Sequence, residues 1–168
     1  KWRASDHIWQ PTNQLRSCNM ENPALTSLDA LTQQMINLAA EGVDFFEVRF
    51  DGFDYTQASL VVVEELLHEA SDFYENMSAE RQDQIVEQVG AYIFEVARRN
   101  FGGRYFWYDA GDQPILLTGL PVFEISLLAY DKVRGRLKNG PEDNIPFFFE
   151  GYAERVRQAK PGDKAMIV

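Results

Sequence analysis

The chain has 168 residues, of which 45% are hydrophobic, 13% aromatic and 25% charged. A chain of this length and composition can bury a large core without a disulfide or a metal, which excludes disordered, collagen-like and low-complexity proteins. Lys and Arg together number 16 against 26 Asp and Glu, so the net charge is −10. This acidity argues against a nucleic acid or a membrane surface as the partner.

Cysteine content and hydropathy bear on the compartment. Cys18 is the single cysteine, so no internal disulfide can form and a cytoplasmic protein is expected. The longest apolar run, residues 60–63, is far shorter than the roughly 20 residues that span a bilayer. The sequence starts at Lys1 rather than Met, so a periplasmic location stays open if a signal peptide was removed before Lys1.

The first 26 residues differ from the rest of the chain. They contain Pro11 and Pro23 and show no sustained hydrophobic period, which predicts an irregular N-terminal arm over residues 1–26. We expect Trp2 and Trp9 of this arm to dock on the body of the protein. Residues 27–168 are predicted to form a single domain.

The domain is predicted to begin with a helix and a strand. Ser27 can cap a helix that runs to about residue 40, and Gly42 can end it. Val43 to Phe50 then alternates between apolar and charged side chains, which is the period of a half-buried strand.

Two long amphipathic helices are predicted next. Apolar side chains recur at helical spacing from about Ala58 to Met77, and acidic residues fill the remaining face. Ser78 can cap a second long helix, which Gly102 and Gly103 would stop.

The C-terminal third is predicted to hold a hairpin and two helices. Residues 104–109 and 113–118 flank a short glycine-containing turn, as in a β-hairpin. Apolar spacing after Pro121 predicts a third core helix that ends at Asn139-Gly140, and a last helix is expected from Asn144 to about Ala159. The predicted class is therefore α+β, with a small antiparallel sheet of about three strands packed by about five helices.

Catalytic and metal-binding side chains are few. The histidines are His7 and His68, too few for the usual triads or for a multi-histidine zinc site. Glu65 and His68 share a helical face, but the second such pair that a di-iron bundle needs is absent, so we interpret His68 as an exposed residue among acids. We expect no metal, no organic cofactor and no catalytic residue, although an acid-base pair of carboxylates is not excluded by spacing.

The acidity is concentrated in one region. Residues 41–80 contain 11 acidic side chains and a single base, Arg49. One interpretation is a solvated helix face that keeps the protein soluble. The other is a surface that attracts a basic macromolecule and accelerates association with it.

One stretch resembles a known group of proteins. It reads Gly90-Ala91-Tyr92-x-x-Glu95, followed by Arg99-Asn100-x-Gly102-Gly103-Arg104-x-x-Trp107. With the Pro-led segment 121–140, this pattern is similar to small bacterial proteins of unknown function, over about residues 43–155. Some of these are associated with neutralising toxins that bacteria deliver to their neighbours, so the resemblance implies an immunity protein. It implies no catalytic residues, and we interpret Glu95, Arg99 and Trp107 as structural.

The functional hypothesis is an acidic protein-binding module, monomeric or homodimeric, that covers a basic partner such as a toxin. The alternatives are a small carboxylate-dependent enzyme and a housekeeping domain of unknown partner. The residues expected to bind the partner are Asp51, Asp54, Tyr55, Glu64, Glu65, Glu69, Asp72, Tyr74 and Glu75.

Overall fold

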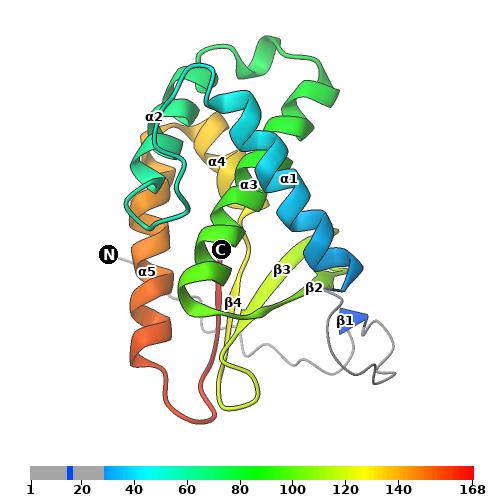
Figure 1. The fold of residues 1–168 in the computed structure, drawn as a ribbon, viewed down its shortest axis with the longest axis vertical. Helices are drawn as coiled ribbons and strands as arrows, with labels where there is room; N and C mark the ends of the chain where they lie inside the picture. The colour runs from blue at the N-terminus through cyan, green and yellow to red at the C-terminus, as the bar shows by residue number, and fades with distance from the viewer. Residues whose placement is uncertain (1–14, 17–28) are drawn as a thin grey trace.

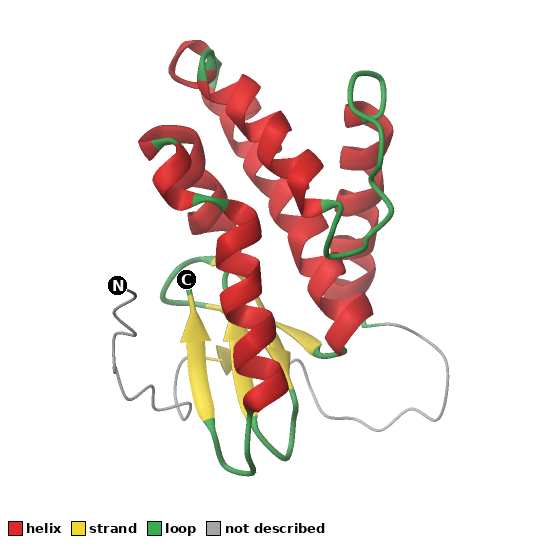
Figure 2. Ribbon diagram, turned by 90° about the vertical axis from the view of Figure 1, so that its left-hand side faces the viewer, coloured by secondary structure: helices red, strands yellow, loops and turns green. Residues whose placement is uncertain are grey.

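The computed structural model describes residues 15–16 and 29–168, and these form five α-helices, two short 3-10 helices and five strands. The α-helices are α1 (Ala30–Phe46), α2 (Leu60–Ser71), α3 (Ala79–Phe101), α4 (Tyr130–Asn139) and α5 (Ile145–Gln158), and the 3-10 helices are η1 (Tyr74–Asn76) and η2 (Pro141–Asp143). The strands are β1 (Leu15–Arg16), β2 (Arg104–Tyr108), β3 (Gln113–Thr118), β4 (Glu124–Leu127) and β5 (Lys164–Ile167). The strands gather at the lower end of the molecule and the upper end is helical (Figures 1 and 2). The predicted α+β class, a small sheet packed by about five helices, is confirmed.

The sheet is mixed rather than antiparallel. Its strand order is β1-β2-β3-β4-β5, and the pairs from β1 to β4 are antiparallel whereas β4 and β5 are parallel. The prediction of an all-antiparallel sheet is wrong because β5 was not foreseen. A parallel neighbour needs a long crossover connection, and α4 and α5 provide it between β4 and β5. Strand β1 falls within the segment predicted as an arm, whose other residues, including Trp2 and Trp9, lie outside the described part of the chain.

Helix α1 extends through the region predicted as a strand. Asp29 caps it by accepting a hydrogen bond from the Thr32 backbone N–H at 2.8 Å, and the predicted cap, Ser27, lies outside the described residues. The helix continues past Gly42 to Phe46. Residues 47–49 then form a turn, so the strand predicted for Val43 to Phe50 is wrong.

Gly42 explains this error. A Cβ atom at Gly42 would lie 3.0 Å from the Cβ of Gln88, so this glycine allows α1 and α3 to approach each other closely instead of ending the helix. Phe46 lies on the same helical stripe as Met35 and Ala39, and all three are buried. The alternation that suggested a strand is therefore the end of a helical pattern that stops at Phe46. Val48, which a half-buried strand would have buried with Phe46, is 88% exposed.

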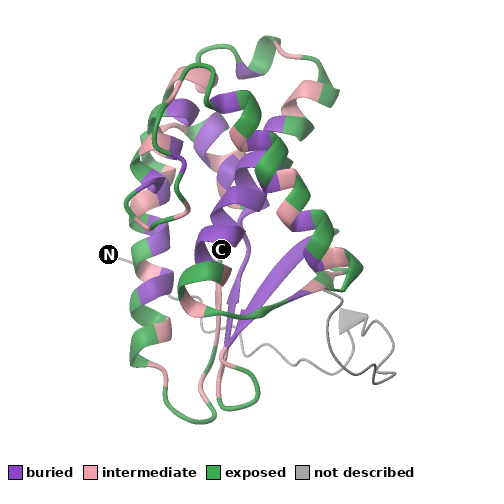
Figure 3. Ribbon diagram, viewed as in Figure 1, coloured by how far each residue is buried: buried purple, intermediate pink, exposed green. Residues whose placement is uncertain are grey.

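Helix α3 is the centre of the helical layer, and its buried residues lie between Ile85 and Ala97 (Figure 3). Both predicted ends are confirmed. The Ser78 side chain accepts a hydrogen bond from the Arg81 backbone N–H at 3.3 Å, and Gly102 ends the helix with a φ of 76°. A long buried helix of this kind positions side chains for both the sheet and the neighbouring helices.

The segment after Pro121 contains a strand before its helix. We predicted one helix from about residue 122 to 139, but Glu124–Leu127 forms β4 and the helix begins only at Tyr130. The spacing is ambiguous, because Ile125 fits a helical stripe together with Leu128 and a strand face together with Leu127. Residues 124–127 form a strand because they pair with β3 on one side and with β5 on the other. The predicted end at Gly140 is confirmed.

The last predicted helix is also confirmed. The Asn144 side chain accepts a hydrogen bond from the Phe147 backbone N–H at 2.9 Å, and α5 runs from there to Gln158. Tyr152 on α5 shares a 2.6 Å hydrogen bond with Thr118 on β3. This bond fastens the helix to the same face of the sheet that the other helices cover.

Candidate functional site

Helix α2 turns one side to the core and the other to solvent. Leu60, Val63, Leu66 and Leu67 are buried. The opposite side presents Val61, Glu65, His68 and Asp72, spaced to lie along one line of the helix, and all four are exposed. Phe73 and Glu75 follow directly and are exposed as well. We call these six residues the outer face of α2: Val61, Glu65, His68, Asp72, Phe73 and Glu75.

The outer face combines negative charge with apolar area. Val61 is 54% exposed and Phe73 is 64% exposed, so the acids Glu65, Asp72 and Glu75 are interspersed with accessible hydrophobic side chains. Large apolar side chains in solvent beside charged residues are a feature of protein-binding surfaces.

The loop of residues 47–59 lies against α2 and brings Asp51 and Asp54 to it. Arg49 in this loop forms an ion pair with Glu69 on α2, and both side chains are partly exposed. Gly52 also approaches Val62 on α2. Asp51 and Asp54 are exposed in this loop, so they lie on the same side of the domain as α2.

The conformation of the loop is fixed by hydrogen bonds to α3. The Tyr92 hydroxyl accepts a hydrogen bond from the Tyr55 backbone N–H at 3.0 Å, and the Asn100 side chain donates one to the Tyr55 carbonyl at 3.1 Å. Tyr55 adopts a φ of 60°, which is uncommon for a residue with a side chain. The hydrogen bonds on both sides of Tyr55 offset the cost of that conformation.

Tyr55 is a rigid, half-buried aromatic side chain. Its ring lies 4.8 Å from the Tyr92 ring, and the Arg99 guanidinium stacks on it at 3.5 Å. Burial raises the pKa of the Tyr55 hydroxyl, so it stays protonated at neutral pH. An aromatic ring held in this way loses little conformational entropy when a partner packs against it.

Asp54 is held as an ionised side chain. Its carboxylate accepts hydrogen bonds from the Thr56 hydroxyl at 2.7 Å and from the Thr56 backbone N–H at 2.9 Å. These hydrogen bonds lower the pKa of Asp54, the side-chain bond contributing most. The negative charge of Asp54 is therefore present and fixed in position at neutral pH.

Two of the nine predicted binding residues are turned largely away from solvent. Glu64 turns inward, where it accepts a hydrogen bond from Arg136 Nε at 2.6 Å and another from the Ile145 backbone N–H at 3.0 Å. Tyr74 is 3% exposed, and burial raises the pKa of its hydroxyl. Glu64 is engaged with α4 and α5 and Tyr74 is buried, so neither residue contributes to the exposed acidic side of α2.

Most of the acids around α2 form no ion pair within the described residues. Glu69 has Arg49 as its partner. Five other acidic side chains form no ion pair with any residue of the described ranges: Asp51, Asp54, Glu65, Asp72 and Glu75. These five acids, together with Val61, His68 and Phe73, form the candidate site. We call this site the acidic surface.

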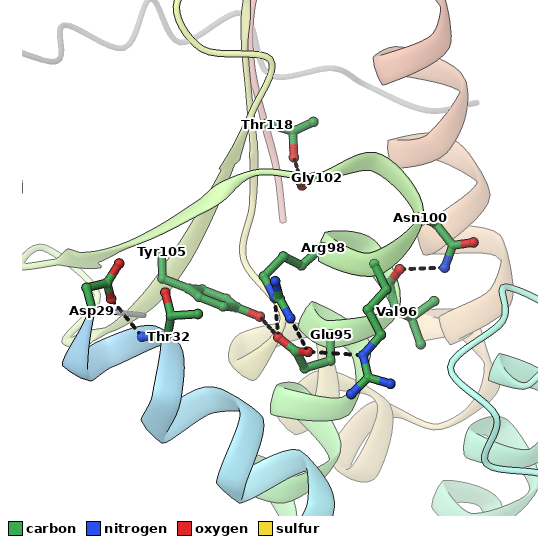
Figure 4. Close-up of polar contacts among 10 residues, drawn as sticks. Asp29, Thr32, Glu95, Val96, Arg98, Asn100, Gly102, Tyr105 and Thr118 are labelled. Carbon is green, nitrogen blue, oxygen red and sulfur yellow. Dashed lines mark hydrogen bonds and ion pairs between the residues drawn. The ribbon is translucent and has the colours of Figure 1, made fainter. Parts of the chain in front are cut away.

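The residues of the Gly90 to Trp107 pattern form a junction between α3 and the sheet (Figure 4). Glu95 is fully buried and accepts hydrogen bonds from Arg98 Nε at 2.7 Å, Arg99 Nε at 3.2 Å and the Tyr105 hydroxyl at 2.9 Å. Burial alone would raise the pKa of Glu95, but the hydrogen bonds from Arg98 and Tyr105 lower it below its ordinary value. The structural role expected for Glu95 and Arg99 fits this geometry, and Trp107 lies at the rim with 36% exposure.

The described residues contain neither a cluster of metal ligands nor a membrane-spanning helix. No three His, Cys, Asp or Glu side chains of residues 15–16 and 29–168 come together as a possible metal site. Within the same ranges no helix has the length and apolar character needed to cross a membrane.

Comparison of the chain with protein-family models, with curated proteins and with solved structures finds no significant match.

Proposed function

We propose that this protein is a protein-binding module that uses its acidic surface to hold a basic protein partner. The observation that carries the proposal is a set of five carboxylates around α2 that form no ion pair with any described residue, on a surface that also exposes Val61 and Phe73. Negative charge without neighbouring bases attracts a basic protein over a distance, and exposed apolar side chains add affinity on contact.

The most concrete form of this function is an immunity protein that covers a cognate bacterial toxin and neutralises it. Its support is the resemblance of residues 43–155 to bacterial proteins associated with toxin neutralisation. Such a protein works by binding alone, so this function requires no catalytic residue and no cofactor. The acidic surface would then supply the contact with the basic toxin.

The test is co-expression with the product of a toxin-like reading frame next to the gene. We expect the protein to restore growth of cells that make this toxin. The triple variant Glu65→Lys, Asp72→Lys and Glu75→Lys is expected to lose this protection and to slow association about tenfold or more. These three acids have no ion-pair partner in the described part of the chain, so the variant should fold normally.

A control variant separates the local effect from the change in total charge. Glu87, Glu142 and Glu154 are exposed on α3, η2 and α5, and replacing them by Lys changes the net charge by the same amount. We expect this control to protect cells and to bind at nearly the wild-type rate. If both variants protect equally well, or if the association rate is indifferent to salt, the acidic surface is not the binding site.

A further inference from the structure

Strand β5, which is red in Figure 1, lies at one edge of the sheet. Its hydrogen-bonded neighbour among the described residues is β4, which runs parallel to it. The Asp163 carbonyl accepts a hydrogen bond from the Glu124 backbone N–H at 2.8 Å, and the Ile167 carbonyl accepts one from the Leu128 backbone N–H at 2.9 Å. Both of these carbonyl groups therefore point towards β4.

The other backbone groups of β5 point away from β4. Successive residues of a strand direct their N–H and C=O groups to opposite sides, so Ala165 bonds to β4 as Asp163 and Ile167 do. The N–H and C=O groups of Lys164 and Met166 then face the edge of the sheet. No backbone group elsewhere in the described chain bonds to them. Strand β5 thus presents two residues that can pair with a further strand.

This edge lacks the usual protection against pairing. Proteins protect the edges of sheets with prolines, bulges or exposed charges. Strand β5 has the sequence Lys-Ala-Met-Ile and pairs with β4 residue by residue, so it contains neither a proline nor a bulge. Its charged side chain is Lys164, whose Nζ lies 3.1 Å from Glu124 Oε2. The ammonium group is therefore directed towards β4, and the backbone of β5 is open to another strand.

The distribution of charge favours a second copy of the chain at this edge. Residues 101–168 contain nine acidic and nine basic side chains and so have no net charge, although the whole chain carries −10. Strands β2 to β5 contain three charged residues, Arg104, Glu124 and Lys164. Two copies that meet at β5 therefore bring neutral regions together, and repulsion between the acidic regions does not oppose the contact.

An antiparallel arrangement makes the edge self-complementary. When Ala165 lies on a two-fold axis, Lys164 of each copy is opposite Met166 of the other, and each such pair exchanges both of its N–H···O=C hydrogen bonds. Ala165 then faces its own counterpart in a pair without hydrogen bonds, where the Cα atoms are about 4.5 Å apart. A small side chain suits this close approach, and alanine provides it.

We infer that β5 pairs antiparallel with β5 of a second copy of the chain, so that two five-stranded sheets join into one continuous sheet. The partner is a second copy because the edge is complementary to itself in hydrogen bonding, side-chain size and charge. Strand β5 contains no residue of the acidic surface, so this dimer does not depend on the proposed function.

Sedimentation equilibrium of the full chain tests the dimer. We expect a mass of twice the 19.3 kDa of one chain. Met166→Pro removes an N–H that points to the second copy and leaves the hydrogen bonds to β4 in place, so this variant should be a folded monomer. Met166→Leu, which keeps the N–H, should remain a dimer. A wild-type mass of one chain at every concentration up to about 100 μM would overturn the inference.

Disulfide cross-linking tests the register without relying on the proline variant. In a Cys18→Ser background, Ala165→Cys is expected to link two copies on oxidation, because a Cα separation of about 4.5 Å suits a disulfide. Val168→Cys is the control: it is 61% exposed, but its two copies would lie about 20 Å apart in this register. We expect about tenfold more linked dimer at position 165 than at position 168. Equal linking at both positions, or none at position 165, would contradict the pairing.

Discussion

Glu64 and Arg136 lie 72 residues apart in the sequence and form an ion pair between α2 and α4, with Arg136 Nε 2.6 Å from Glu64 Oε1. The Arg136 side chain is 2% exposed and the Glu64 side chain 17%. The second oxygen of Glu64 accepts the Ile145 backbone N–H at the start of α5, so one carboxylate joins three helices. This contact turns the Glu64 carboxylate toward the interface of the three helices, where it is largely shielded from solvent.

The first prediction concerns this contact. Glu64→Ala is expected to lower the free energy of unfolding by about 3 kcal/mol or more, because it leaves the charge of Arg136 buried without a partner. Urea unfolding followed by circular dichroism measures the change. Glu65→Ala, at the next and exposed position, should stay within about 0.5 kcal/mol of wild type. Equal stability of the two variants would show that Glu64 is not a structural residue.

The second prediction concerns two glycines in helices. A Cβ atom at Gly90 would lie 2.4 Å from Cδ1 of the buried Tyr130 ring, so Gly90→Ala is expected to destabilise the protein by about 1–3 kcal/mol through overpacking. Nothing lies within 4 Å of the same atom at Gly151 on α5. Gly151→Ala should therefore stabilise the protein by about 0.5–1 kcal/mol, because alanine favours the helix. Thermal unfolding that moves both variants in the same direction would contradict this account of the α3–α4 contact.

The third prediction is the pH dependence that Glu95 gives to stability. The pKa of Glu95 in the folded protein lies below its ordinary value of 4.5, because the hydrogen bonds from Arg98 and Tyr105 outweigh the opposing effect of burial. A carboxyl group of this kind stabilises the fold above its unfolded pKa, and the stabilisation is lost as the pH falls through its folded pKa. Glu95→Gln is thus expected to cost about 2 kcal/mol at neutral pH, and this cost should shrink as the pH drops below about 4.5.

Unfolding by urea at neutral pH and at about pH 3 measures this difference. Glu142→Gln removes the same formal charge at an exposed position of η2 and is expected to change stability by less than about 0.5 kcal/mol at both pH values. A Glu95→Gln cost that is as large at about pH 3 as at neutral pH would mean that hydrogen bonding does not favour the ionised form of Glu95.

The fourth prediction separates apolar contact from charge on the acidic surface. Phe73 is 64% exposed, so Phe73→Ala should leave stability within about 0.5 kcal/mol of wild type. If Phe73 anchors the basic partner, the same change raises the Kd about tenfold or more, mainly through faster dissociation. Isothermal titration or surface plasmon resonance measures this effect, with Leu120→Ala as the control for an exposed apolar residue in the β3–β4 loop. A Kd that Phe73→Ala leaves unchanged would exclude this side chain from the interface.

Local signals predicted both ends of α3 and the hairpin correctly. Ser78 caps α3 and Gly102 ends it, because a cap acts through its own side chain or backbone on residues three or four positions away. Strands β2 and β3 join through a short turn, so their pairing was also a local feature. The concentration of acids between residues 41 and 80 likewise needed no structure to be seen.

The tertiary structure decided the features that depend on distant neighbours. Gly42 continues a helix because Gln88 lies against it, and residues 124–127 form a strand because β3 and β5 pair with them. Glu64 and Glu65 are adjacent identical residues of one helix, yet Arg136 and the start of α5 take the first into the core and leave the second in solvent. A sequence pattern records which residues can share a face, whereas the partner of that face is set by chain segments tens of residues away.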